Sequence, residues 1–345
     1  MTIKLLAVGD LHLGRRPPRL PEHLSARIDD FSPATAWERV IALALRERVQ
    51  AVLLAGDVAE STQDYFEALP RLQAGAARLS RAGIQLLAVS GNHDVDILPR
   101  LINEVPDARL LGAGGQWESV GITGDASGNP EQVTVWGWSF PALRVNESPI
   151  LTLPANHGPG PHLGLLHCDR DQSQSPYAPV TSEQLRNTGF DAWLLGHIHQ
   201  PDALGTDQAM GYLGSVVGLD AGEPGPRGPW LLEIRDGRIQ RLEQRPLAPL
   251  RWERLDVDIT GVTAGAAVTT AISRRLEALA TDLTRGVDWP DLVGLRIRLV
   301  GECDLTREAM EAELPDSGRA MGLPGSGQIQ WFLERLRIDT RPTIP

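Results

Sequence analysis

The sequence feature that most constrains the fold is an apolar run that ends in glycine and is followed at once by a metal-capable side chain. Three such runs, at 3–8, 51–55 and 84–90, lead to Asp10, Asp57 and Asn92. Short continuous apolar runs are typical of strands buried on both faces of a parallel sheet. Ligands of such sheets bind beyond the carboxyl ends of the strands, so we expect these polar residues to converge.

Helical patterns separate the strand-like runs. Ser32 is suited to an N-cap and Pro33 to the first helical position, and apolar residues then recur on one helical face. A second helical stretch covers roughly 63–82 and ends near Gly83, a residue type favoured just beyond helix ends. The alternation of strand and helix predicts an α/β fold.

The second half of this region repeats the strand-and-ligand pattern. HLGLLH ends at His167, and AWLLGHIH ends at His197 and His199. Shorter strand-like runs lie between and after them, and Asp236-Gly237 marks a hairpin turn. For residues 1–245 we therefore predict a β-sandwich of two sheets flanked by helices, with the polar cluster in loops at one end.

A proline-rich linker at 245–252 predicts a domain boundary. Residues 252–345 then read as a separate, small C-terminal α/β domain. In LRIRLVG the leucines and isoleucine alternate with Arg296 and Arg298, which predicts a half-buried strand with a basic outer face.

Composition limits the classes of protein that fit. The net charge of −11 excludes a polybasic nucleic-acid binder, although it leaves room for a local basic groove. Two cysteines cannot build a disulfide framework and favour a reducing compartment. With neither a signal-peptide pattern nor a membrane-length apolar stretch, we expect a cytoplasmic protein without membrane contact.

Eight side chains at the predicted strand ends could bind metal. They are Asp10, His12, Asp57, Asn92, His93, His167, His197 and His199. Each motif taken singly is also consistent with a turn or a helix cap. Together they exceed what one tetrahedral zinc needs and suit two divalent ions that share a carboxylate. Mixed imidazole, carboxylate and amide donors favour manganese or iron, with zinc as a further option.

These motifs resemble a known family. GDLHLG (9–14), GDV (56–58), GNHD (91–94), LHCD (166–169) and GHIH (196–199) resemble the calcineurin-like metallophosphoesterase superfamily in order and spacing. GDLHLG and the segment 211–234 further resemble SbcD-type and YhaO-type DNA repair exonucleases. By position and pattern, residues 252–345 resemble the small α/β cap domain of SbcD-type nucleases. Leu213 stands where those nucleases have a proline.

The resemblance implies a role for each ligand. Asp10, His12 and His199 would bind one ion, and Asn92, His167 and His197 the other. Asp57 would bridge the two ions, and a hydroxide held between them would attack phosphorus in line. His93 would stabilise the transition state and protonate the leaving oxygen.

Glu60 marks a departure from the archaeal relatives, which carry a histidine three residues after the bridging aspartate. We expect Glu60 to orient the catalytic His93, with Asp94 as another candidate. The alternative is that Glu60 caps or precedes the helix that begins near Ser61.

The motifs predict a phosphoester substrate without specifying which one. Arg15, Arg16 and Arg19 follow the first motif and would contact a DNA backbone, or form a solvated surface loop. We expect a manganese-dependent DNA exonuclease or endonuclease of DNA repair. The alternatives are a phosphodiesterase acting on cyclic nucleotides or nucleotide derivatives, and a non-catalytic scaffold. The resemblance also implies a coiled-coil ABC-type ATPase partner, SbcC-like or YhaN-like, and a homodimer.

Overall fold

The computed structural model describes residues 2–124, 131–312, 320–321 and 329–342. The chain divides into two compact units. The first unit comprises Met1–Arg15, Pro33–Val216 and Arg227–Arg245, and the second comprises Arg16–Ser32, Val217–Pro226 and Pro246–Pro345. Two segments from the first 245 residues thus group with the C-terminal residues.

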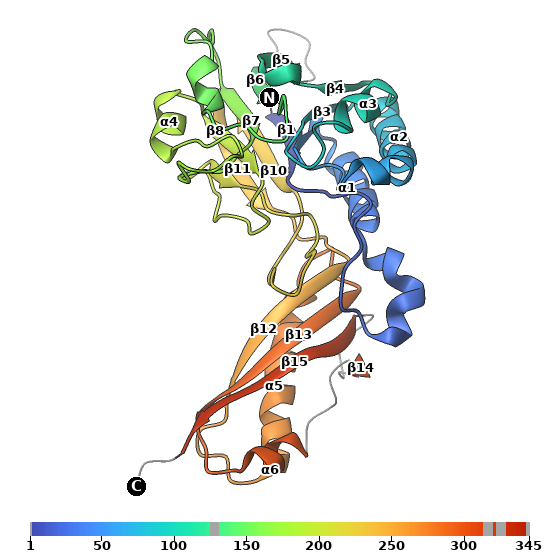
Figure 1. Ribbon diagram of the computed structural model, residues 1–345, viewed down its shortest axis with the longest axis vertical. Helices are drawn as coiled ribbons and strands as arrows, with labels where there is room; N and C mark the ends of the chain where they lie inside the picture. The colour runs from blue at the N-terminus through green and yellow to red at the C-terminus, as the bar shows by residue number, and fades with distance from the viewer. Residues whose placement is uncertain (1, 125–130, 313–319, 322–328, 343–345) are drawn as a thin grey trace. The chain divides into compact units, whose positions relative to one another are not determined.

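The first unit contains a six-stranded and a five-stranded sheet (Figure 1). The first sheet has the order β11-β10-β1-β2-β3-β4, with β1 (Thr2–Val8), β2 (Ala51–Ala55), β3 (Gln85–Val89), β4 (Ala108–Leu110), β10 (Trp230–Arg235) and β11 (Arg238–Gln244). The second sheet has the order β5-β6-β7-β8-β9, with β5 (Trp117–Thr123), β6 (Gln132–Trp138), β7 (His162–His167), β8 (Ala192–Gly196) and β9 (Met210–Tyr212).

The two sheets pack face to face around one apolar core. Alternate residues of β1, such as Leu5, meet residues of the second sheet, such as Val135 and Leu165, in this core. The side chains on the other face of the second sheet, such as Trp193, point away from this core and pack against Leu185 of α4. Strands buried on both faces need apolar residues at nearly every position, which explains their continuous apolar runs. The predicted two-sheet α/β fold is confirmed.

Helices flank the sandwich on both sides (Figure 1). The α-helices of this unit are α1 (Pro33–Glu47), α2 (Tyr65–Arg81), α3 (Leu98–Asn103) and α4 (Ser182–Asn187), and the 3₁₀ helices are η2 (Thr62–Asp64), η3 (Ala113–Gly115) and η4 (Pro149–Thr152). Helix α1 begins at Pro33 and buries Trp37, Val40 and Ile41 on one face. The predicted hairpin also forms, because Asp236 and Gly237 both adopt positive φ angles between β10 and β11.

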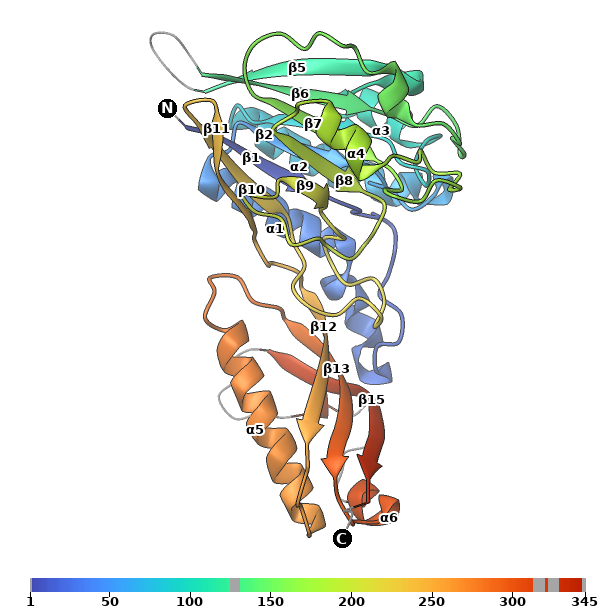
Figure 2. The same cartoon turned by 90° about the vertical axis from the view of Figure 1, so that its left-hand side faces the viewer.

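The second unit is a four-stranded sheet with α5 on one face (Figure 2). Its elements are η1 (Glu22–Phe31), β12 (Leu250–Asp258), α5 (Gly265–Leu283), β13 (Leu292–Glu302), α6 (Arg307–Glu311), β14 (Ala320–Met321) and β15 (Gln330–Arg341), in the sheet order β12-β13-β15-β14. Apolar residues of α5, including Ile272 and Leu276, pack on Leu295 and Ile297 of β13.

Specific contacts explain why the two earlier segments join this unit. The indole Nε1 of Trp252 donates to the Gly218 carbonyl at 3.1 Å. Arg19 lies 3.7 Å from a carboxylate oxygen of Glu334 on β15. Among the described residues, no helix combines the length and the apolar composition needed to cross a membrane.

Candidate dinuclear metal centre

The candidate ligands follow strands from both sheets of the first unit. Asp10 follows β1, Asp57 follows β2, Asn92 follows β3, His167 ends β7 and His197 follows β8. Strands β1, β2 and β3 are parallel to one another, and so are β7 and β8. The loops at their carboxyl ends therefore meet at one edge of the sandwich.

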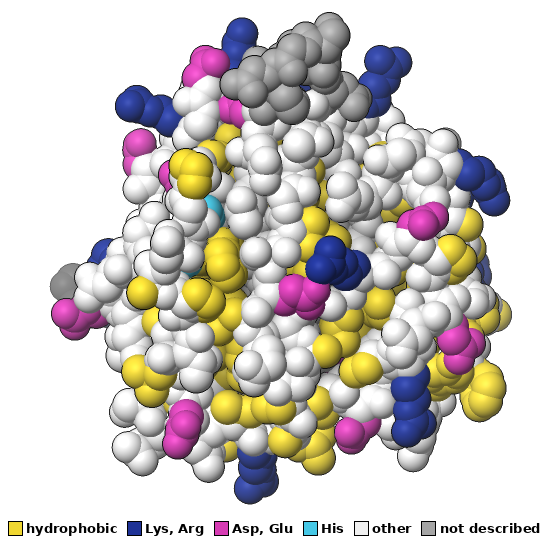
Figure 3. Space-filling view, turned by 90° about the horizontal axis from the view of Figure 1, so that it is seen from above, with side chains coloured by type: hydrophobic (Ala, Val, Ile, Leu, Met, Phe, Trp, Pro, Cys, Tyr) yellow, Lys and Arg dark blue, Asp and Glu magenta, His cyan; other side chains and the backbone are white. Residues whose placement is uncertain are grey.

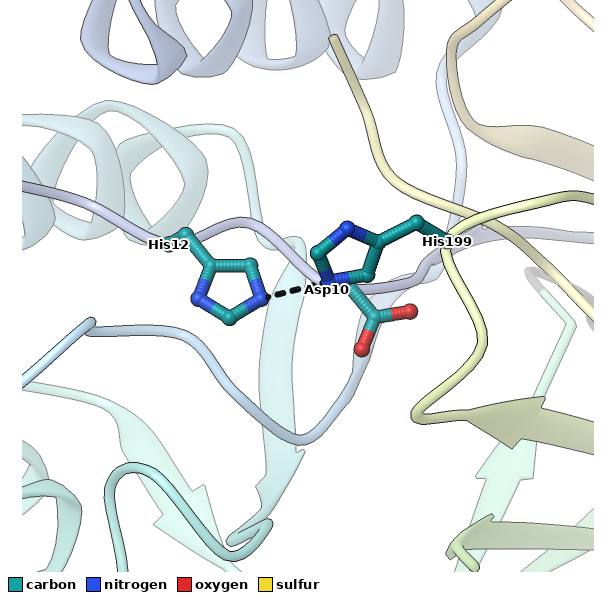
Figure 4. Close-up of side chains that lie close together, drawn as sticks. All are labelled: Asp10, His12 and His199. Atoms are coloured by element: carbon teal, nitrogen blue, oxygen red, sulfur yellow. Dashed lines mark hydrogen bonds between the residues drawn. The ribbon is translucent and has the colours of Figure 1, made fainter. Parts of the chain in front are cut away.

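The first group of ligand atoms comes from Asp10, His12 and His199. One ligand atom of each lies within 4.8 Å of the others. The Nε2 atoms of His12 and His199 face each other at 3.0 Å, with the Asp10 carboxylate beside them (Figure 4). Asp10 is fully buried and its Oδ1 accepts from the His197 amide at 2.9 Å. Its Oδ2 has no hydrogen-bond donor among the described residues, so a cation fits this position.

The second group comes from Asp57, His167 and His197, whose ligand atoms also lie within 4.8 Å of one another. His167 is fully buried, and its Nε2 lies 3.1 Å from Oδ1 of Asn92 and 3.3 Å from Oδ2 of Asp57. Carboxylate, amide and imidazole donors together suit a divalent transition metal.

Asp57 connects the two groups. Its Oδ2 lies 3.3 Å from His167 Nε2 and 4.0 Å from His12 Nε2, so one oxygen faces a histidine of each group. Burial opposes ionisation of this carboxyl, but the charge and hydrogen bond of His167, followed by the charges of His12 and His93, hold its pKa well below the usual range. An ionised carboxylate between two ligand groups is suited to bridging two ions.

Polar contacts orient the rings of two of the candidate ligands, His167 and His197. His167 Nδ1 lies 3.1 Å from the Ala55 carbonyl, an arrangement in which Nδ1 carries the proton and Nε2 is left for a metal. His197 Nε2 lies 3.3 Å from Oδ1 of Asp169, which leaves Nδ1 of His197 for a metal. We assigned Asp169 no role from the sequence, although it ends the LHCD motif and sits two residues after His167.

Glu60 makes its short contact with His12. Its Oε2 lies 2.6 Å from His12 Nδ1, whereas its Oε1 lies 3.9 Å from Nδ1 of His93. The hydrogen bond to His12 lowers the Glu60 pKa, with burial opposing it and the charges of His12 and Arg15 adding to it. Glu60 is thus placed to orient His12, a predicted metal ligand, more directly than His93, the predicted general acid. The sequence expectation that it orients His93 stays a prediction.

His93 lies at the rim of the centre. Its side chain is 44% exposed, and its ring meets that of His12 edge to face at 5.3 Å between centroids. Its backbone amide donates to Oδ1 of Asp57 at 3.0 Å. The chain therefore places His93 beside both groups of ligands while leaving part of its ring open to a substrate.

Asp94 is a brace between two loops. It is fully buried, and its carboxylate accepts the backbone amides of Gly91 and Val58, each at 2.7 Å. These bonds tie the loop after β3 to the loop after β2. The geometry favours this bracing role over the orienting of His93.

The three arginines after the first motif each lie near a carboxylate. Arg15 belongs to the first unit and lies 3.9 Å from Glu60, whereas Arg16 and Arg19 belong to the second unit. Arg16 donates to Asp29 at 3.0 Å. Arg19 lies 3.7 Å from Glu334, so each of the three arginines has a carboxylate nearby. Contact between these arginines and DNA stays a prediction.

Unusual backbone conformations occur at the centre itself. His12, Asp57 and His197 have φ angles of 47°, 48° and 105°. Non-glycine residues rarely adopt positive φ, and such strain collects where function fixes a side chain. Gly91 is required for a related reason, because a Cβ there would lie 2.2 Å from Oδ1 of Asp57.

Arg227 supports the loop that carries the last histidine pair. Its side chain is buried, and its guanidinium donates to the His199 carbonyl and to the Gln200 side chain. His162 is buried, and its Nδ1 accepts from the indole Nε1 of Trp136 at 3.2 Å.

Two family models match the chain. The model described as calcineurin-like phosphoesterase matches residues 3–201. The model of the middle domain of metallophosphoesterase YhaO matches residues 252–341.

Individual relatives are more distant. The chain is 28% identical over 280 residues to the uncharacterized metallophosphoesterase YhaO of Bacillus subtilis (strain 168), covering 75% of this chain and 64% of that protein. It is 30% identical over 279 residues to the DNA double-strand break repair protein Mre11 of Haloferax volcanii, covering 75% of this chain and 55% of that protein. The chain thus spans less than two thirds of the length of either relative.

Among solved structures, the calcineurin-like phosphoesterase YfkN of Bacillus subtilis is similar, with a TM-score of 0.44 and 13% identity over 81% of this chain and 98% of that one. The phosphoesterase model covers more than half of the 345 residues. The chain therefore belongs to the calcineurin-like phosphoesterase family.

Proposed function

We propose that this chain is a dinuclear-metal phosphodiesterase that cleaves DNA in a manganese-dependent reaction. The observation that carries the proposal is the buried, ionised Asp57 carboxylate, which lies between two groups of metal-capable side chains. Two divalent ions at such a site supply Lewis-acid activation of the phosphorus centre and of the attacking water.

The ligands divide as the geometry groups them. Asp10, His12 and His199 would hold one ion, and His167, His197 and Asn92 the other, with Asp57 shared between them. Manganese is our choice because the donors mix imidazole, carboxylate and amide; iron and zinc share some of these preferences.

His93 would supply the proton for the leaving oxygen. Its ring is partly exposed, and Nδ1 is the nitrogen nearer to Glu60, at 3.9 Å. The Nε2 atom is then left to face a substrate and to protonate the departing group. Asp57, by accepting the His93 amide, fixes the backbone on which this imidazole stands.

DNA is the proposed substrate because the Mre11 relatives are named as double-strand break repair proteins. We assign residues 1–245 to the catalytic domain and residues 252–345 to a cap domain. The match of residues 252–341 to the YhaO middle domain supports this division. A coiled-coil ATPase partner, a homodimer and a cytoplasmic location are further proposals that rest on the same relatives.

The test compares substrates on one purified sample with added Mn²⁺. Labelled linear duplex and single-stranded DNA are followed beside cyclic AMP and bis-p-nitrophenyl phosphate, with Asp57→Asn as the inactive control. DNA cleavage that disappears in Asp57→Asn supports the proposal. Hydrolysis of the small diesters with intact DNA would instead establish a small-molecule phosphodiesterase.

A further inference from the structure

The outer face of the four-stranded sheet in the second unit concentrates arginine side chains. Strands β12, β13 and β15 lie side by side with matched register. Two consecutive rows across these strands are Arg254–Arg296–Arg335 and Asp256–Arg298–Arg337. We call these five arginines the arginine face.

The arginine face is open to solvent because the helix lies on the other side of the sheet. Leu255, Ile297 and Leu299 point into the core with α5, so their neighbours in sequence point outward. Arg254, Arg298, Arg335 and Arg337 are exposed, and Arg296 is half-buried. The five arginines line a hollow of about 530 Å³ together with Asp256 and Ile297.

This arrangement carries more positive charge than its neighbours neutralise. Arg296 pairs with Glu334 at 2.6 Å, Arg298 pairs with Asp256, and Arg337 lies 3.3 Å from Asp339. Arg19 also lies 3.7 Å from Glu334, and the charge of Asp220 acts on Arg296, so six guanidinium groups face four carboxylates and a surplus of two positive charges remains.

The surplus corresponds to two particular arginines. Within the described residues no carboxylate lies within 4.0 Å of Arg254 or Arg335, and both stand directly opposite Arg296. Like charges directly opposite one another destabilise a sheet. In a chain of net charge −11, two arginines thus flank Arg296, whose own charge pairs with Glu334.

The chemistry of the arginine face selects the kind of ligand. Neighbouring strands lie about 4.8 Å apart and successive outward residues about 6.6 Å apart, so the guanidinium groups form a grid. Planar guanidinium forks suit bidentate contacts with phosphate oxygens. None of the large exposed apolar residues of the described chain lies on β12, β13 or β15. The face thus lacks both the aromatic platform that stacks bases and the apolar centre of a protein interface.

On the face of the molecule seen in Figure 3, by contrast, Lys and Arg side chains stand apart and are interspersed with Asp and Glu. We propose that the arginine face binds the phosphodiester backbone of DNA without reading its sequence. The proposal rests on the proposed DNA nuclease function and adds to it a substrate-holding surface on the second unit.

The test measures the salt dependence of DNA binding by the full chain. Anisotropy of a labelled duplex is recorded between 50 and 200 mM NaCl, with EDTA present so that the DNA is not cleaved. The variant Arg254→Gln/Arg335→Gln removes the two arginines of the face that have no carboxylate within 4.0 Å in the described part of the chain. The matched control, Arg274→Gln/Arg275→Gln, removes two exposed arginines of α5 on the opposite side of the sheet.

Each lost phosphate contact reduces the slope of log affinity against log salt by about 0.9, so the double variant should lose about 1.8. Between 50 and 200 mM NaCl the wild type should then lose about twelvefold more affinity than the variant. The control should keep the wild-type slope. Equal slopes for variant and wild type, or an equal loss in the control, would overturn the proposal.

Two further readouts separate this proposal from the proposed function. Hydrolysis of bis-p-nitrophenyl phosphate should be unchanged in the arginine variant, because it leaves the metal centre intact. If the wild type cleaves DNA and the arginine variant keeps the wild-type salt slope, only the proposed role of the arginine face is refuted. If neither diester is hydrolysed, the proposed function fails, while a reduced slope would still support the face. If polyglutamate binds the wild type better than the variant and DNA does not, the ligand is an acidic protein.

Discussion

Replacing Glu60 with glutamine should weaken metal binding at the site built from His12. The Glu60 carboxylate lies 2.6 Å from His12 Nδ1, and its charge favours a proton on that nitrogen, which leaves Nε2 for a metal. Losing a carboxylate behind a ligating histidine typically costs about 10- to 100-fold in metal affinity. Glutamine keeps an oxygen acceptor but loses the charge, so we expect a loss of about tenfold, or about 1.4 kcal/mol.

The assay is calorimetric titration of metal-free protein with Mn²⁺, fitted to two binding steps. Asp169→Asn is the matched comparison, because Asp169 stands behind His197 in the other group of ligands. Each variant should weaken one step and leave the other close to wild type. Asp169 stands at a longer distance, 3.3 Å, so its loss should have the smaller effect.

The two roles considered for Glu60 give opposite results. If Glu60 orients His12, the glutamine variant binds Mn²⁺ more weakly in one step. Turnover then falls mainly because fewer sites hold metal. If it orients His93 instead, both metal-binding steps stay at wild-type affinity and turnover falls at saturating Mn²⁺. The second outcome would refute our reading of the 2.6 Å contact.

Three other predictions concern the centre and the core. His93→Ala should retain both metals by elemental analysis and lose about 100-fold or more in turnover, since general acid catalysis contributes about 10²–10⁴-fold; loss of metal would contradict this role. Burial lowers the pKa of His167 but the charge and hydrogen bond of Asp57 outweigh it and raise that pKa to about 9. The raised value means that His167 in the metal-free protein is protonated below about pH 9, so Mn²⁺ must displace a proton, and its affinity should fall by up to tenfold per pH unit between pH 8 and 6; titrations at several pH values with equal affinity would contradict it. Gly164→Ala should destabilise the first unit by about 1–3 kcal/mol in denaturant unfolding, because its Cβ would lie 2.2 Å from the Trp193 ring, whereas Gly205→Ala, with open space around it, should be near neutral.

The sequence is most informative where an apolar run and the polar residue that follows it mark the same strand end. Apolar runs bounded by glycine identify the strands, and the residue just after each run identifies its carboxyl end, as at Asp10 and Asp57. The hairpin at Asp236-Gly237 is equally local, because the two residue types tolerate the positive φ angles that its turn requires. Such features need only neighbours in sequence.

Contacts between distant segments are beyond that kind of reasoning. Asp169 supports His197 from another strand end, and Glu60 meets His12 across 48 residues of chain. The grouping of 16–32 and 217–226 with the C-terminal residues likewise depends on contacts such as Trp252 with Gly218. No local pattern carries this information, because the two partners of each contact lie far apart in the sequence.

Departures from local rules occur at both surfaces to which we assign function. At the metal centre three residues hold positive φ, and burial together with the charge of Asp57 raises the pKa of Asp94 to about 7. On the second unit, three arginines stand opposite one another in a single row. Each arrangement lowers the stability of the metal-free, DNA-free protein. Bound cations would relieve the first by compensating buried carboxylates, and bound phosphates would relieve the second.

We therefore expect Mn²⁺ to raise the thermal unfolding temperature of the wild type by more than that of Asp57→Asn. Duplex DNA should likewise raise this temperature more for the wild type than for Arg254→Gln/Arg335→Gln. Equal shifts in wild type and variant would mean that these departures have some other cause.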